Sequence, residues 1–66
     1  MARYKRIRDL REDFSLTQAQ IAKALGLYTT TYARYESGER EIPFNIAIRI
    51  AQYYNVSLDF LASQIE

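Results

Sequence analysis

The chain has 66 residues, 48% of them hydrophobic and 26% charged, with a formal net charge of +1. A chain of this length buries only about 60% of its unfolded surface, which excludes a multidomain enzyme and predicts one domain over residues 1–66. The sequence contains no cysteine and no histidine, so disulfides, thiolate metal clusters and imidazole catalysis are excluded. We therefore expect a protein that is not an enzyme and that uses no metal or cofactor.

The charges are unevenly distributed along the chain. Residues 1–14 carry five cations against three carboxylates, whereas residues 38–66 carry two cations against four carboxylates. The basic end is either a solvated helix face or a surface that meets phosphate. No apolar run approaches the roughly 18 residues of a transmembrane helix, and the chain begins with charge rather than a signal-peptide core. A cytoplasmic protein with no membrane partner is expected.

Apolar residues recur at helical spacing, and no segment alternates as a strand does. The pattern predicts an all-α fold of five helices, over about residues 3–13, 18–25, 29–37, 43–54 and 58–64. The expected buried positions of the first and fourth helices are Ile7, Leu10, Phe14, Phe44, Ala47, Ile48, Ala51 and Tyr54.

Short motifs mark the helix ends. Thr17 and Gln20 have the T-x-x-Q spacing of a capping box for the second helix. Gly26 and Gly38 supply left-handed residues that end the second and third helices, and Ser57 is placed to cap the fifth.

The two helices around Gly26 have the spacing of a helix-turn-helix. Small or apolar residues stand where the helices must touch, namely Ala22, Leu25, Leu27 and Tyr32. The spacing alone also fits an ordinary helical hairpin.

Four segments in order resemble the Cro and phage-repressor family of helix-turn-helix proteins, often called the Xre family. They are LTQAQIA at 16–22, LGL at 25–27, RYESGER at 34–40 and NVSLDFL at 55–61. The resemblance extends from about residue 7 to 61. It implies a five-helix, lambda-repressor-like DNA-binding domain that works as a dimer on a palindromic operator, with the third helix as the recognition helix.

The resemblance also implies which residues read bases. Tyr28, Thr29, Thr30 and Arg34 match the positions that reach base edges in such repressors. A guanidinium can bind guanine O6 and N7 in a bidentate manner, which makes Arg34 the strongest candidate for specificity. The two threonines suit contacts with bases or phosphates. Alternatively, they serve only to start the third helix. Tyr28 stands where the family has a serine or threonine cap.

A second group of residues matches phosphate contacts. Gln18, beside Thr17, stands at a helix N-terminus, where free N–H groups and the helix dipole favour an anion. The alternative for Gln18 is a solvated first-turn residue. Arg40 is the one cation in the loop after the third helix, and Lys5 and Arg6 of the basic first helix complete the expected phosphate group.

Other residues match structural roles. By the resemblance, Arg11 and Glu36 form a buried or partly buried salt bridge between the first and third helices. The aromatic residues are expected to lie mostly in the core: Tyr4, Tyr32, Tyr35, Tyr53, Tyr54, Phe14, Phe44 and Phe60. Ile46, Ile50 and Tyr53 form a second apolar stripe on the fourth helix, which together with the fifth helix we expect to be a dimer surface.

The sequence thus predicts a sequence-specific transcriptional regulator that represses by occupying its operator. The expected partners are double-stranded DNA and a second copy of the chain, without a small-molecule ligand domain. Two alternatives stay open. An antitoxin or a restriction-modification controller uses the same domain, and the acidic loop with its low net charge fits a protein-interaction module that has lost DNA affinity.

Overall fold

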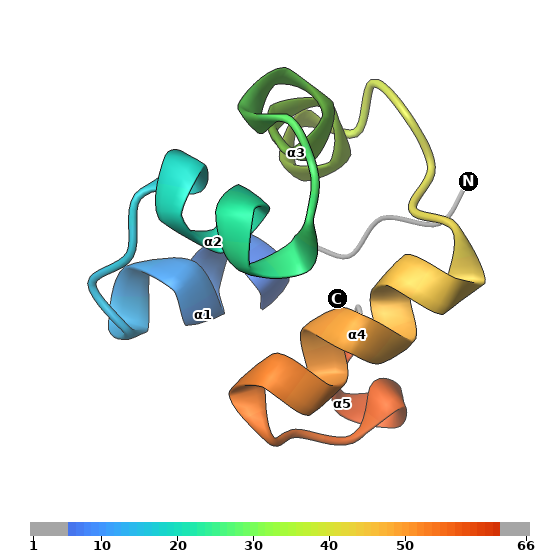
Figure 1. The fold of residues 1–66 in the computed structure, drawn as a ribbon. Helices are drawn as coiled ribbons and strands as arrows, with labels where there is room; N and C mark the ends of the chain where they lie inside the picture. Colours follow the sequence, from blue (N-terminus) through green and yellow to red (C-terminus); the bar gives the residue numbers. More distant parts are fainter. Residues whose placement is uncertain (1–5, 63–66) are drawn as a thin grey trace.

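The computed structural model describes residues 6–62. Five helices follow one another there: α1 (Arg6–Asp13), α2 (Gln18–Leu25), α3 (Thr29–Ser37), α4 (Phe44–Tyr54) and α5 (Leu58–Ala62). Within that range there is no strand, and the all-α fold class is confirmed (Figure 1). The expected extensions of the first and fifth helices, together with Tyr4 and Lys5, lie outside the described residues. No helix in residues 6–62 has the length and apolar character needed to span a membrane.

The start of α2 is fixed by the expected capping box. The Gln20 backbone N–H donates to Thr17 Oγ1 at 3.1 Å, and the Thr17 N–H donates to Gln20 Oε1 at 2.8 Å. The two bonds satisfy donors that the first turn of a helix leaves free. The exposed polar side chains therefore set where α2 begins.

A tight turn at Gly26 joins α2 to α3. Gly26 has φ +74°, and the Leu27 N–H donates to the carbonyl of Ala22 at 2.8 Å, which closes the end of α2. A side chain at this φ is strained, so glycine suits the turn. Gly38, with φ +83°, ends α3 in the same way.

The remaining helix ends form where the sequence predicts them, and α3 lacks a side-chain cap, as expected from Tyr28 at that position. Tyr28 occupies the N-cap of α3 and makes no side-chain capping bond. Pro43 precedes α4, Asn55 ends it with φ +57°, and the Ser57 hydroxyl accepts the Phe60 N–H at 2.9 Å to cap α5.

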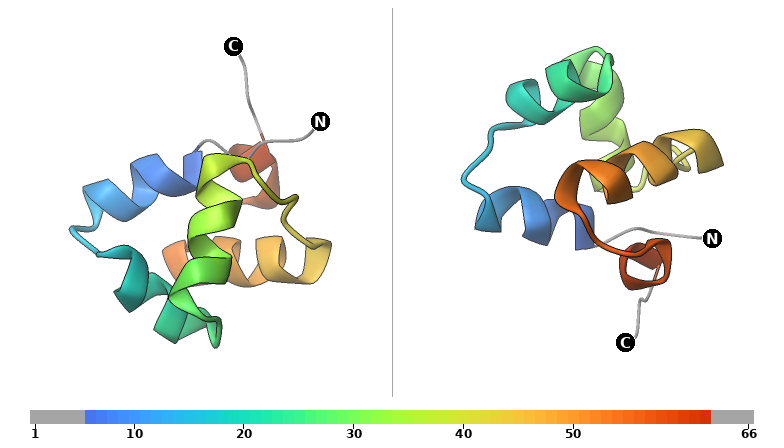
Figure 2. Two further views of the ribbon diagram at one scale, coloured as in Figure 1. Left: turned by 90° about the horizontal axis from the view of Figure 1, so that it is seen from above. Right: turned by 60° about the horizontal axis from the view of Figure 1, so that its bottom comes forward.

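One apolar core lies between the five helices. Figures 1 and 2 show α3 and α5 at opposite ends of the molecule, with α2 in contact with both α3 and α4. Every helix contributes buried side chains to this cluster: Ile7, Leu10, Ile21, Ala22, Leu25, Tyr32, Tyr35, Ile42, Ile46, Ala47, Ile50, Ala51, Tyr54 and Leu61. Because α1, α2 and α3 share this core, their relative positions are fixed by packing.

The prediction that the aromatic residues lie mostly in the core was wrong. Tyr32, Tyr35 and Tyr54 are buried, but four of the expected rings are exposed to solvent by two fifths or more: Phe14 (52%), Phe44 (67%), Tyr53 (45%) and Phe60 (41%). Phe14 follows the last residue of α1, and its ring packs edge-on against Tyr54 with centroids 5.0 Å apart.

The expected faces of α4 also need correction. Ile46 and Ile50 are buried in the core, so they do not form a surface stripe for a partner. Phe44 precedes Ile46 by two residues, or about 200° around the helix, and it therefore points to solvent. Ile48 lies two residues after Ile46 and is only partly buried for the same reason. The expected core positions Ala47, Ala51 and Tyr54 are buried as predicted. The core thus takes residues of α4 from both predicted patterns and leaves Phe44 and Tyr53 exposed.

Candidate nucleic-acid interface

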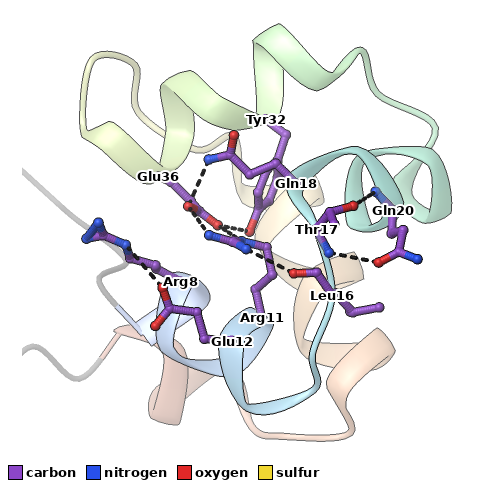
Figure 3. Close-up of polar contacts among 9 residues, drawn as sticks. All are labelled: Arg8, Arg11, Glu12, Leu16, Thr17, Gln18, Gln20, Tyr32 and Glu36. Carbon is purple, nitrogen blue, oxygen red and sulfur yellow. Dashed lines mark hydrogen bonds and ion pairs between the residues drawn. The ribbon is translucent and has the colours of Figure 1, made fainter.

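Arg11 of α1 and Glu36 of α3 form the salt bridge expected between these helices. Arg11 Nε lies 2.6 Å from Glu36 Oε2, and its Nη2 lies 3.2 Å from Oε1, so the pair is bidentate (Figure 3). The side chains are 14% and 5% exposed, which largely shields the pair from water. Arg11 Nη1 also donates to the carbonyl of Leu16 at 2.9 Å. One side chain thus ties α1 to α3 and to the segment that precedes α2.

Two further side chains donate hydrogen bonds to the same carboxylate, and neither contact was predicted from the sequence. Gln18 Nε2 donates to Glu36 Oε1 at 3.1 Å, and the Tyr32 hydroxyl donates to Oε2 at 2.7 Å (Figure 3). Tyr32 precedes Glu36 by four residues, a helical spacing that brings side chains together and could have indicated the second bond. The bond from Gln18 depends on how α2 crosses α3, which no local pattern encodes.

This network determines the ionisation of its members. Burial alone raises the pKa of the Glu36 carboxyl, but the hydrogen bonds from Arg11, Tyr32 and Gln18 outweigh it and hold that pKa below its ordinary value. Burial, followed by the hydrogen bond to Glu36, raises the pKa of Tyr32. The hydrogen bond to Glu36 raises the pKa of Arg11. Glu36 is therefore an anion, and Arg11 and Tyr32 keep their protons at neutral pH.

The residues expected to read bases lie on the outer side of α3. Tyr32 and Tyr35 anchor the inner side in the core, while Thr29, Thr30 and Arg34 are exposed on the helix. Thr30 and Arg34 are four residues apart and therefore lie on one face. The Tyr28 ring, 84% exposed, precedes them.

Arg34 and Arg40 are both accessible, and within residues 6–62 only Arg34 lies within ion-pair distance of a carboxylate. Arg34 Nε lies 3.9 Å from Glu39 Oε2, and both side chains are about half exposed or more (48% and 66%). Such an exposed pair is weak. Arg40 is exposed in the loop that follows α3.

The expected phosphate residues divide between two regions. Thr17 and Gln18 lie together at the start of α2, although Gln18 is already bonded to Glu36. The guanidinium of Arg6 lies over the Phe60 ring, 4.6 Å from its centroid, where α1 meets α5. Arg6 thus lies at the contact of α1 with α5, whereas Thr17 and Gln18 stand at the start of α2. Lys5 lies outside the described residues.

The sequence model of the helix-turn-helix family matches residues 7–61. The chain belongs to this family. The match extends from the start of α1 to Leu61 in α5. It confirms the resemblance to Cro and phage-repressor proteins.

Three helix-turn-helix relatives illustrate the similarity. The chain is 32% identical over 57 residues to the HTH-type transcriptional regulator YobD of Bacillus subtilis, covering 86% of this chain and 51% of YobD. It is 33% identical over 61 residues to the cryptic phage CTXphi transcriptional repressor RstR of Vibrio cholerae, covering 92% and 55%. A crystal structure of a transcriptional regulator from Listeria innocua superposes with a TM-score of 0.85 at 30% identity, covering 100% of this chain and 63% of that one. The chain thus spans about half the length of these curated relatives.

Proposed function

We propose that this chain is the DNA-binding domain of a sequence-specific transcriptional regulator that represses by occupying its operator. The observation that carries the proposal is the polar network at Glu36, which joins α1, α2 and α3 and holds the exposed face of α3 in one orientation. A fixed helix with short polar and guanidinium side chains outward suits insertion into the major groove. The regulators and the repressor named above support the same function.

Within this proposal, α3 reads the bases. Arg34 leaves its weak pair with Glu39 and binds guanine O6 and N7. Thr29 and Thr30 contact a thymine methyl or the sugar-phosphate backbone through their methyl and hydroxyl groups. Tyr28, which contributes nothing to capping, is available to stack on a sugar or a base edge.

The start of α2 and the flanking cations hold the phosphates. Gln18 Nε2 gives one hydrogen to Glu36, and its second hydrogen is directed to a phosphate oxygen, with Thr17 beside it. Arg40 from the loop supplies a further cation, and Lys5 and Arg6 of the N-terminal end contact the DNA backbone separately from the group at the start of α2. These contacts position the domain without reading sequence.

The active form is a homodimer on a palindromic operator. The support lies in the exposed rings, of which Phe44 at the start of α4 is the most exposed after Tyr28. Large exposed apolar side chains are typical of contact surfaces. Two copies then meet two half-sites about 34 Å apart, one turn of the duplex.

Two alternative functions have support: a protein-interaction module, from the acidic loop, and an antitoxin or restriction-modification controller, which uses the same domain. Glu39 and Glu41 flank Arg40, so phosphate affinity in that loop is low, which favours a module that binds protein instead. An antitoxin or a restriction-modification controller binds DNA with this same domain, and a neighbouring toxin or methyltransferase gene identifies either role.

Selection of bound duplexes from a random-sequence library tests the proposal. We expect enrichment of a palindrome whose half-site centres are about 10–10.5 base pairs apart. A salt titration on the enriched duplex should show affinity that falls steeply as salt rises. Absence of any enriched sequence, with no salt-dependent binding to duplex DNA, would contradict the proposal and favour the protein-interaction module.

A further inference from the structure

A surface hollow lies where α1, α2 and α3 meet. It has a volume of about 140 Å³ and is lined by Arg8, Gln18, Ala33, Glu36 and Ser37. The three helices therefore contribute side chains to one small concave site beside the proposed phosphate contact of Gln18.

The carboxylate in this hollow does not repel an anion strongly. Glu36 accepts hydrogen bonds from Arg11, Tyr32 and Gln18, and the Arg11 guanidinium neutralises its charge at 2.6 Å. The Ser37 hydroxyl donates to the Arg34 carbonyl at 3.1 Å, so its hydrogen is also in use. The donors left for a ligand are the second amide hydrogen of Gln18 and the guanidinium of Arg8.

Arg8 is held only loosely where it is. Its Nε lies 3.9 Å from Glu12 Oε2, and the two side chains are 64% and 61% exposed. An exposed i, i+4 pair of this length contributes little to stability, so the guanidinium is able to turn toward a stronger anion. A phosphate, with its charge and several acceptor oxygens, is such an anion.

The geometry of α1 separates Arg8 from the other cation at its start. Arg8 and Arg11 are three residues apart, so their side chains leave neighbouring parts of the α1 surface. Figure 3 shows the Arg11 guanidinium at Glu36 and the Arg8 guanidinium turned to Glu12, while Arg8 also lines the hollow. Arg6 precedes Arg8 by two residues, so it points to the other side of the helix, where it covers the Phe60 ring. The sequence predicted a phosphate contact for Arg6, whereas the fold places Arg8 and not Arg6 in the hollow beside Gln18.

We propose that Arg8 is a phosphate-binding residue of the DNA interface and contacts the same backbone phosphate as Gln18. The inference rests on the proposed DNA-binding function, and it adds a cation from α1 to the phosphate contacts. Arg8 neutralises this phosphate while Gln18 orients it, and Glu12 competes for the guanidinium when DNA is absent.

Salt-dependent binding of the Arg8→Gln variant to the selected duplex tests the assignment. Loss of one phosphate contact should reduce the steepness of log affinity against log salt by about 0.9. Between 1 M and 0.1 M salt, the ratio of wild-type to variant affinity should therefore rise by roughly eightfold. Lys23→Gln is the matched control because it removes the same charge from an exposed position on α2 outside the hollow. Equal slope changes in the two variants would overturn the proposal, because net charge would then explain the effect.

A second comparison uses the competing carboxylate. Glu12→Gln should tighten binding by up to about fivefold, and the gain should vanish in the Arg8→Gln background. Asp13→Asn changes the net charge equally without touching the Arg8 pair, so it is the control. Equal gains from the Glu12 and Asp13 variants would overturn the proposed competition at Arg8.

The wild-type protein separates this inference from the function on which it rests. If wild type binds no duplex, the proposed function fails. If wild type binds with a steep salt slope that Arg8→Gln leaves unchanged, DNA binding stands and the assignment of Arg8 is wrong.

Discussion

Arg11 and Glu36 are 25 residues apart in the chain and form a bidentate, largely buried ion pair. The pair joins the last turn of α1 to the last turn of α3, and the amide of Gln18 on α2 donates to the same carboxylate. The ion pair and the Gln18 bond thereby add a polar link between three helices that also share the apolar core. Its removal should affect both stability and the presentation of α3.

Glu36→Ala should be strongly destabilising. It leaves the Arg11 guanidinium without its partner, and breaking a buried pair costs about 3–5 kcal/mol. For a domain of this size the melting temperature should fall by about 10 °C or more, as measured by circular dichroism. Glu39→Ala, which removes an exposed carboxylate from the weak pair with Arg34, is the control. Equal melting temperatures for the two variants would exclude a buried pair.

Loss of the hydroxyl should change the melting temperature differently at two buried tyrosines, Tyr32 and Tyr54. Tyr32 donates to Glu36 at 2.7 Å, and a hydrogen bond to a charged group contributes about 1.5–3 kcal/mol. Tyr32→Phe should therefore lower the melting temperature by about 6 °C or more. The Tyr54 hydroxyl is buried without a hydrogen-bond partner among residues 6–62, so Tyr54→Phe should cost no stability. A larger loss for the Tyr54 variant than for the Tyr32 variant would reverse this assignment.

The acid titration of Glu36 should follow from its lowered pKa. Because the folded chain holds this pKa below its ordinary value, the unfolded chain takes up the proton at higher pH. The stability that ionised Glu36 contributes is fully present above the ordinary glutamate pKa of about 4.3 and is lost as pH falls through the folded pKa. Carbon NMR of the Glu36 carboxyl should give a midpoint below 4.3. A midpoint above it would show that burial outweighs the three donors.

The selected operator should be occupied by two copies of the chain. The palindrome expected from the selection presents the same half-site twice, and each domain carries one α3. Sedimentation equilibrium of the complex should give a mass of two chains per duplex. A complex with one chain per full operator would contradict the dimer, whatever the state of the free protein.

Local chemistry in the sequence predicted most of the fold. The capping box at Thr17 and the glycine at position 26 each define a helix end through bonds to neighbours in the chain, and both were predicted. The side on which Phe44 and Ile46 lie was not, because that choice depends on which face of α4 meets the core. Likewise, Gln18 and Glu36 are 18 positions apart in the chain, and their hydrogen bond forms only because α2 crosses α3.

The distinction between Arg6 and Arg8 has the same origin. Both belong to the basic N-terminal end, and the charge pattern treats them alike. The packing of α5 against α1 places Phe60 beneath Arg6, while α2 and α3 form the hollow beside Arg8. Composition indicates that cations are present, and tertiary structure assigns them to different surfaces.

The base preference of Arg34→Ala on the selected operator tests the central claim most directly. A bidentate contact with guanine gives about 1–3 kcal/mol of discrimination, so the variant should lose preference at one base pair per half-site. Gln18→Ala is the control and should weaken specific and non-specific binding about equally, with base preference and salt slope unchanged. Affinities for duplexes with single base-pair substitutions give the result. If Arg34→Ala keeps every base preference and changes only the salt slope, α3 does not read sequence through Arg34, and the proposed recognition is contradicted.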